Sequence, residues 1–307
     1  MIFPLNSFPP LALLALLVVS DRPAQATLNV VATTPDLGAI ALEVGGDRID
    51  LTTLAKSTED PHFVDAKPSF IVRLNRANVL IDGGADLEIG WLAPLLQGAR
   101  NSRIAAGQPG RIMASAGVPL LDIPTVLDRS QGDIHAAGNP HFLADPVNAK
   151  IVATHLAQAF TSLEPSSANV FTTNLQRFNG RVDAKLAEWQ ALLAPYQGQP
   201  LVTYHNYWIY FGRRFGFPMT LFLEPKPGIP PTPAHLAEVI GKMKAQNAKL
   251  ILVQPYQSRR TAETVARHAD GVVLDFPSFP GEPGPEGYLE WVDLLVYTVA
   301  QGFSRGH

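Results

Sequence analysis

The sequence predicts an α/β protein of two Rossmann-like lobes, each a mostly parallel sheet flanked by helices, joined by one long rigid helix. Short apolar, β-branched runs alternate with helical stretches in the first half of the 307 residues, and the second half repeats this alternation. Such alternation is typical of parallel sheets. A long stretch with helical periodicity separates the halves. We expect a first lobe over 27–163, a connecting helix over 164–196 and a second lobe over 197–307, with a ligand site in the cleft between the lobes.

The first half opens with an apolar run, 28–34, that is expected to form a strand. Pro35 follows and can start a helix, because its fixed φ suits a first helical position, and Gly45-Gly46 would end that helix. The further elements expected in this half are a strand over 49–54, a helix over 68–75, a strand over 79–82, a helix over 87–96 and a strand over 118–123.

The stretch between the halves has the periodicity of a long helix. A first helix over 148–163 is interrupted near Glu164-Pro165, and Ser166 can cap a second one. About 28 residues at a rise of ~1.5 Å would give a rod of roughly 40 Å, long enough to pack along both halves. Apolar residues recur along it at helical spacing: Phe171, Leu175, Phe178, Val182, Leu186, Trp189 and Leu193.

The second half is expected to contain a similar set of elements. Thr232 can cap a helix that has Pro233 at its first position. The expected strands are 201–204, 219–223, 250–253 and 272–274, and the expected helices are 207–215, 233–244, 259–268 and 287–302.

Residues 1–26 have the features of a secretory signal peptide. Leu11–Val19 is an apolar run too short to span a bilayer, and Ala24-Gln25-Ala26 has the small-x-small pattern of a cleavage site. The sequence has no cysteine, so it offers no disulfide, no thiolate ligand and no cysteine for lipid attachment. We therefore expect a periplasmic protein without a lipid anchor. The alternative is a disordered or buried N-terminal segment.

Composition and motifs argue against several classes of function. A formal net charge of −3 with scattered basic residues gives no basic surface for nucleic acid. The sequence lacks the H-E-x-x-H helix of metalloproteases, the G-x-S-x-G elbow, the Walker loop and the dinucleotide fingerprint. We expect a monomer that neither binds nucleic acid, spans a membrane nor acts as an enzyme.

Three histidines and one aspartate stand at the ends of expected strands or in nearby loops. His62 follows the second expected strand, and His141 lies in a loop before a helix. His205 and Asp275 each end a strand of the second half. Because ligands of open α/β sheets collect at the carboxyl ends of strands, these residues could meet in the cleft. Three imidazoles and a carboxylate suit tetrahedral Zn²⁺, although a single loop histidine is more often solvated or a helix cap.

Six segments carry a resemblance to a known family. They are DPHFVDAKPS (60–69), GNPHFLADP (138–146), YHNYWIYFGRRFG (204–216), PPTPAHLAEVIGKMK (230–244), LILVQPYQSRRTAETVA (250–266) and LDFPS (274–278). In this order they resemble the zinc/manganese solute-binding family of ABC transporters, of the periplasmic zinc-uptake type. The resemblance implies a metal between two lobes, its delivery to an ABC transporter permease in the inner membrane, and four ligands: His62, His141, His205 and Asp275.

The third ligand position favours Zn²⁺ over Mn²⁺. Manganese-selective members resemble this pattern with Glu in that place, whereas this sequence has His205, and nitrogen in place of oxygen shifts the preference toward zinc. Many members carry a long His-rich loop where this sequence has the short stretch 124–137. Its one histidine, His135, is either a remnant of that loop that contacts incoming metal transiently or a solvated loop residue, and the second interpretation is favoured.

Three alternatives remain open at this point. The first is a zinc-dependent hydrolase that uses an open position on the three-His site, although a fourth protein ligand would close that position. The second is a Mn²⁺-specific binding protein. The third is a scaffold with vestigial metal binding.

Overall fold

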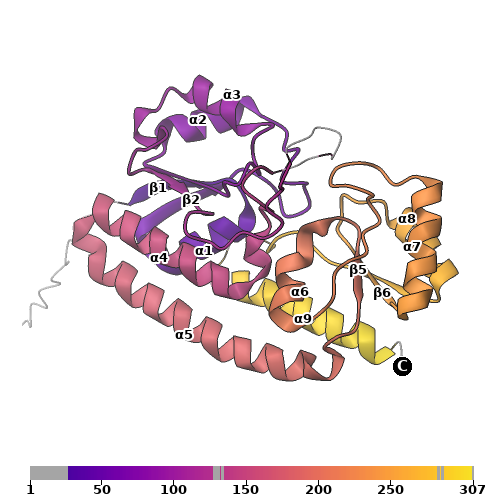
Figure 1. Cartoon of the computed structure of the whole chain (residues 1–307). Coiled ribbons are helices and arrows are strands. Elements are labelled where there is room, and N and C mark those ends of the chain that lie inside the picture. The colour runs from indigo at the N-terminus through magenta and orange to yellow at the C-terminus, as the bar shows by residue number, and fades with distance from the viewer. Residues whose placement is uncertain (1–26, 127–131, 133–134, 282–283, 285–286, 306–307) are drawn as a thin grey trace, which may run out of the picture.

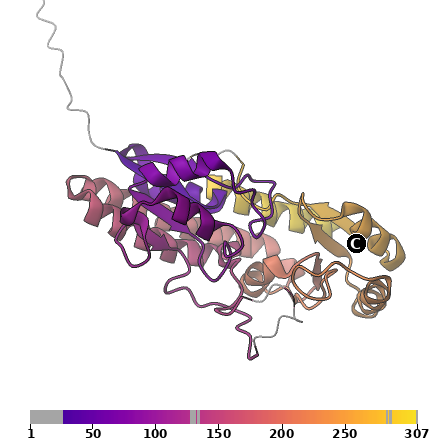
Figure 2. The ribbon, with the colours of Figure 1, turned by 90° about the horizontal axis from the view of Figure 1, so that it is seen from above.

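The computed structural model describes residues 27–126, 132, 135–281, 284 and 287–305. Two lobes lie side by side along a long helix that runs beneath both (Figures 1 and 2). The expected signal peptide, residues 1–26, lies outside the described residues. In the described parts of the chain, no helix is long and apolar enough to cross a membrane. The expected α/β class is confirmed.

Within the described residues, the first lobe is a four-stranded parallel sheet in the order β2-β1-β3-β4, with helices on both faces. Its elements are β1 (Leu28–Ala32), α1 (Pro35–Gly45), β2 (Ile49–Thr53), α2 (Pro68–Arg76), β3 (Val79–Asp82), α3 (Leu92–Ala99), β4 (Arg111–Met113) and α4 (Pro146–Leu163). Alternate strand residues enter different cores: Val30 packs with α1 and α4, whereas Val31 packs beneath α2 and α3. Both faces are therefore buried, as a parallel sheet requires.

The second lobe follows the same plan with a smaller sheet. The described strands lie in the parallel order β5-β6-β7. The elements are β5 (Leu201–Thr203), α6 (Ile209–Phe215), α7 (Pro233–Gln246), β6 (Leu250–Val253), α8 (Arg259–Ala269), β7 (Val272–Asp275) and α9 (Gly287–Arg305). Val202 and Ile251 pack beneath α7 and α8, whereas Leu250 and Leu252 face α9 and a core shared with the first lobe.

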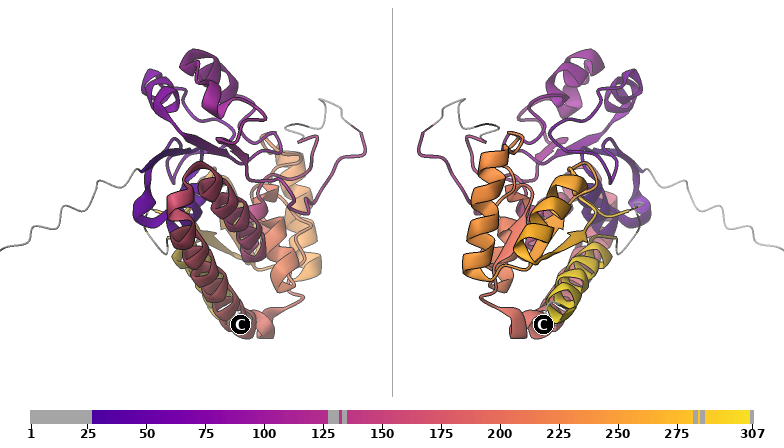
Figure 3. Two further views of the ribbon diagram at one scale, coloured as in Figure 1. Left: turned by 90° about the vertical axis from the view of Figure 1, so that its left-hand side faces the viewer. Right: turned by 90° about the vertical axis from the view of Figure 1, so that its right-hand side faces the viewer.

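Helix α5 (Ala168–Leu193) is the predicted connecting rod and is about 40 Å long. It packs against α1 and α4 of the first lobe and against α9 of the second (Figure 3). Its buried apolar residues are among those that the periodicity predicted, from Phe171 to Leu193. Trp189 also donates a hydrogen bond from Nε1 to Asp293 Oδ1 of α9, at 2.6 Å. The rod is thus tied to both lobes.

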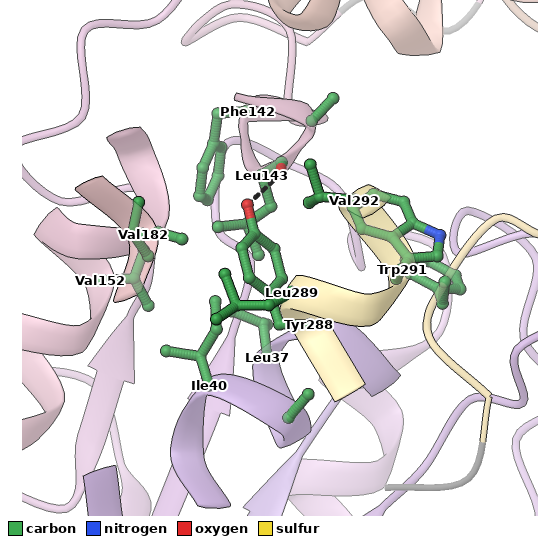
Figure 4. Close-up of a cluster of buried hydrophobic side chains, with 14 of the residues drawn as sticks. Leu37, Ile40, Phe142, Leu143, Val152, Val182, Tyr288, Leu289, Trp291 and Val292 are labelled. Carbon is green, nitrogen blue, oxygen red and sulfur yellow. Dashed lines mark hydrogen bonds between the residues drawn. The ribbon is translucent and has the colours of Figure 1, made fainter. Parts of the chain in front are cut away.

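One apolar core continues from the first lobe into the second. Figure 4 shows its centre, where Tyr288 and Val292 of α9 pack against Phe142 and Leu143, which precede α4. The Tyr288 hydroxyl donates a hydrogen bond to the Leu143 carbonyl oxygen at 2.8 Å. This contact fixes the end of the first lobe that carries His141 against the last helix of the chain.

The prediction of a strand over 118–123 is wrong. These residues form a loop, because Pro119 has no N–H for a sheet ladder. The backbone of Leu121 bonds elsewhere: its N–H donates to the Tyr210 hydroxyl at 2.8 Å, and its carbonyl accepts from Asn139 N at 2.7 Å. The loop therefore links the two lobes, and β4 forms the edge of the sheet instead.

The strand expected over 219–223 is reduced to a single parallel bridge between Thr203 and Phe222. Backbone hydrogen bonds still hold this segment beside β5: Thr203 N donates to Leu221 O at 3.3 Å, and Glu224 N donates to Tyr204 O at 2.9 Å. The pairing is too short to count as a strand, but it places Glu224 next to the end of β5.

Helix α3 begins later than the expected range 87–96, because the residues before it form a turn around buried Glu88. Oε1 of Glu88 accepts hydrogen bonds from Thr33 Oγ1 at 2.6 Å and from Gly83 N at 2.7 Å. Burial, and then the charge of Asp82, raises the pKa of Glu88 to about 7. The folded protein therefore favours the protonated form of this carboxyl.

This shift predicts how stability depends on pH. The usual pKa of Glu88 is 4.5 and the folded value is about 7, so between these values the folded chain holds more protons than the unfolded chain. The free energy of unfolding should therefore fall as pH rises through this window, by about 3 kcal/mol from this group. Urea unfolding at several pH values measures the free energy of unfolding. In Glu88→Gln this free energy should depend less steeply on pH. Glu290→Gln, at an exposed glutamate of α9, is the control, and equal slopes for the two variants would contradict the assignment.

A second prediction concerns the contact between α9 and the first lobe. Tyr288→Phe leaves the buried Leu143 carbonyl without its donor, so we expect the free energy of unfolding to fall by about 1–2 kcal/mol. The matched control is Tyr297→Phe, at a half-exposed tyrosine of the same helix. Urea unfolding measures both, and an equal loss for the two variants would show that the hydrogen bond adds no stability.

Candidate metal centre

Three of the four expected ligand residues meet between the lobes. His62 lies in the loop after β2, His141 shortly before α4, and His205 two residues after the end of β5. Their ring centroids are 5.1 to 5.6 Å apart. One ring nitrogen from each lies within 4.8 Å of those of the other two. Two rings come from the first lobe and one from the second, so the cluster bridges the lobes.

The spacing of the ring nitrogens is close to that of a zinc site. Zn–N bonds of about 2.0–2.1 Å in a tetrahedron place neighbouring nitrogens roughly 3.3–3.4 Å apart. Nitrogens within 4.8 Å of one another reach that spacing through small movements of the rings. The cluster can therefore hold a single tetrahedral cation once the rings move closer together.

Asp60 fixes the orientation of the His62 ring. Its Oδ1 accepts a hydrogen bond from His62 N at 3.0 Å and lies 2.8 Å from His62 Nδ1. Burial acts to raise the pKa of Asp60, but the hydrogen bond from His62, and the charge that this ring carries whenever it is protonated, outweigh burial, and the pKa lies below its usual value. An ionised carboxylate only accepts, so Nδ1 carries the proton and Nε2 presents a lone pair. Trp91 Nε1 holds the loop by donating to Pro61 O at 2.9 Å.

Glu224 fixes the His205 ring in the same way. Its Oε2 lies 2.7 Å from His205 Nδ1 and also accepts from Gly228 N at 3.1 Å. The carboxylate again assigns the proton to Nδ1 and leaves Nε2 as a free lone pair. This pair is the carboxylate–histidine arrangement that orients metal-bound imidazoles.

His141 is the most deeply buried member of the cluster. Its ring stacks on Tyr207 with centroids 4.0 Å apart, and its backbone N–H donates to Asn139 Oδ1 at 2.9 Å. Burial, and then the charges of the neighbouring histidines, lowers the pKa of His141 well below its usual value, so the ring is neutral. Its buried Nε2 has no hydrogen-bond partner among the described residues. A buried unpaired nitrogen costs about 1–3 kcal/mol, which a bound cation would recover.

The structure does not bring Asp275 into this cluster. The aspartate ends β7 as expected, but its side chain is 63% exposed. Its two carboxylate oxygens lie 3.2 and 3.1 Å from Arg259 Nη1. The role expected for Asp275 stays a prediction, and it requires the carboxylate to leave Arg259.

His135 is not the solvated residue that the sequence suggested. It is partly buried beside His62, with their Nε2 atoms 3.2 Å apart. Burial, and then the charges of His62 and His205, lowers the pKa of His135 to about 4, against the opposing effect of backbone hydrogen bonds at Ala85 and Asp86. The ring is therefore neutral.

The sequence did not identify Glu224, and the interpretation of His135 that it favoured was wrong. Glu224 lies 19 residues after His205, and only the pairing of its segment with β5 brings the two together. His135 meets His62 across 73 residues. For His135 the available signal was its place in the stretch 124–137, between two of the expected ligands.

The Glu224–His205 pair generates a testable prediction. Glu224→Gln retains the shape of the side chain but removes the charge that orients the imidazole, so zinc affinity should fall roughly 10- to 100-fold. Competition with a chromophoric chelator measures the affinity. Glu238→Gln removes an exposed carboxylate of α7 and serves as the control. Equal affinities for the two variants would show that Glu224 does not support the metal site.

Relatives found by sequence cover nearly the whole chain. A family model described as zinc-uptake complex component A, periplasmic, matches residues 30–302. The manganese ABC transporter substrate-binding lipoprotein PsaA of Streptococcus anginosus is 22% identical over 96% of both chains. The iron ABC transporter substrate-binding lipoprotein MtsA of Streptococcus pyogenes serotype M1 is 22% identical over 91% of this chain and 89% of its own.

Solved structures share the fold. A crystal structure of ZnuA superposes with a TM-score of 0.75 at 18% identity, covering 90% of this chain and 99% of its own. A manganese-bound periplasmic metal binding protein from Candidatus Liberibacter asiaticus gives a TM-score of 0.72 at 19% identity, covering 89% and 98%. The relatives are substrate-binding proteins of transporters rather than enzymes. From the family match over residues 30–302, the chain belongs to the metal ABC transporter substrate-binding proteins, in the family of zinc-uptake complex component A.

Proposed function

We propose that this protein captures Zn²⁺ through His62, His141 and His205 and delivers it to an ABC-type importer in the inner membrane. The observation that carries the proposal is the convergence of three imidazoles between the lobes. Two of them have Nδ1 engaged by a carboxylate, so each directs a lone pair on Nε2 toward a common point.

The donor set supports zinc over manganese or iron. The clustered atoms are imidazole nitrogens, which suit Zn²⁺, whereas Mn²⁺ prefers carboxylate and carbonyl oxygen. The carboxylates of Asp60 and Glu224 contact the far ring nitrogens of His62 and His205 instead of joining the cluster. Because relatives are named for manganese or iron, Mn²⁺ is the alternative cargo, and the measurement below includes it.

Capture and release would use loops more than movement of whole lobes. The lobes share one core, and Asn139 Nδ2 also donates across the cleft to Asn206 O at 2.9 Å. Arg214 of α6 forms two hydrogen bonds with Asp145 at 2.8 and 2.7 Å. These links oppose wide opening. In the proposal, the loaded protein waits in the periplasm and docks on the permease, which displaces the loops that carry the ligands.

The test is a zinc titration of the chain after removal of metal by a chelator. We expect one equivalent of tightly bound Zn²⁺, weaker binding of Mn²⁺, and at least a 100-fold loss of zinc affinity in His205→Ala, because one of three nitrogen ligands is lost. His268→Ala is the control, since this histidine lies on the outside of α8 and bonds only to the Thr264 carbonyl oxygen among the described residues.

Two results would overturn the proposal. A chain that holds no stoichiometric zinc would argue for a different metal or a scaffold role. Zinc binding that is equally strong in His205→Ala and His268→Ala would show that the metal binds elsewhere. If Mn²⁺ outcompetes Zn²⁺, the proposed site would stand, but its transported metal would be Mn²⁺.

A further inference from the structure

A fourth imidazole stands beside the three-histidine cluster. His135 Nε2 lies 3.2 Å from His62 Nε2, and the two rings have centroids 5.2 Å apart with a tilt of 36°. Because Asp60 engages Nδ1 of His62, this Nε2 is the atom that His62 offers to a metal. His135 therefore directs a ring nitrogen at Nε2 of His62, the atom available to a metal, and not at Nδ1, which contacts Asp60.

The separation matches that of two ligands on one metal. Nitrogens bound to tetrahedral zinc lie roughly 3.3–3.4 Å apart, and the observed separation of the two Nε2 atoms is 3.2 Å. His135 is not among the residues whose nitrogens all lie within 4.8 Å of one another. Its ring must therefore move toward His141 and His205 when the four nitrogens close around an ion, while His62 already has the required spacing to it.

The surroundings of His135 hold its ring at the mouth of the site. Backbone hydrogen bonds at Ala85 and Asp86 engage the His135 ring, and both residues adopt left-handed φ, at 50° and 63°. That conformation is uncommon for residues other than glycine. Asp86 also accepts from Ala136 N at 3.1 Å. The turn at Ala85 and Asp86, whose backbone is constrained, therefore positions this ring.

His135 also lines two cavities at the surface, and His62 of the cluster lines the smaller one beside it. One, of about 460 Å³, is lined by Asn139 and Asn206, and the other, of about 220 Å³, by Phe63 and Ile89. A ring in this place would cover a bound ion from the solvent side.

From this geometry we propose that His135 is the fourth protein ligand and closes the site as an all-imidazole set. The inference rests on the proposed function and deepens it. It assigns to His135 the place expected for Asp275, whose carboxylate is exposed and paired with Arg259. An all-nitrogen site would further disfavour Mn²⁺ relative to Zn²⁺.

The test compares His135→Ala with Asp275→Asn in the full chain. X-ray absorption at the zinc edge counts bound imidazoles, and we expect four in the unchanged protein and in Asp275→Asn, and three in His135→Ala. We also expect zinc affinity to fall roughly 10- to 100-fold in His135→Ala, with faster release to a chelator, and to stay unchanged in Asp275→Asn. Urea unfolding of each variant checks that the fold persists.

The outcomes separate this inference from the proposed function. If His135→Ala keeps the imidazole count and affinity of the unchanged protein while His205→Ala loses zinc, the inference fails and the proposed function stands. If Asp275→Asn alone weakens binding, Asp275 is the fourth ligand and the inference fails. If His205→Ala also binds zinc normally, the proposed function itself fails.

Discussion

The single apolar core that continues through both lobes is the constraint on which the rest of the structure depends. Tyr288 and Trp291 of α9 pack against Phe142 and Leu143 from the other lobe, all nearly excluded from water. Each fully buried side chain of this size contributes about 1.5–3 kcal/mol relative to exposure. Separating the lobes would expose many of them together. The distance between the ligands contributed by the two lobes is therefore set by the core.

Within this frame, the histidines differ in how firmly they are held. His141 precedes α4 in the shared core and stacks on Tyr207. His62 and His135 belong to loops at the surface of the first lobe and are only partly buried. A centre with one firmly held ring and two on loops can retain its geometry and still exchange an ion. In the proposed function, contacts with a permease would act first on these loops.

Carboxylates prepare the site without occupying it. Asp60 and Glu224 bond to the far nitrogens of two rings, so each ring is fixed in one tautomer before a cation arrives. The same contacts remove these oxygens from the set of possible ligands. Carboxylates that face a metal are oxygen donors and favour Mn²⁺, whereas a site in which carboxylates contact only the far side of the imidazoles offers nitrogen donors and favours Zn²⁺.

The sequence by itself determined the features that depend on local pattern. The strands Val79–Asp82 and Leu250–Val253 and the rod Ala168–Leu193 follow from apolar runs and helical spacing, which act over a few neighbouring residues. The ends of parallel strands share one edge of a sheet, so the positions of His62 and His205 after two expected strands were enough to place both near a cleft.

Only the tertiary structure decided the contacts between distant segments. In the loop over 118–123, the N–H of Leu121 donates to Tyr210 of the other lobe instead of to a neighbouring strand. Glu224 reaches His205 only through pairing of its segment with β5. Asp275 pairs with Arg259, and His135 turns inward to His62. No local periodicity specifies these four outcomes, because each depends on which polar partner the packed lobes bring within hydrogen-bonding distance.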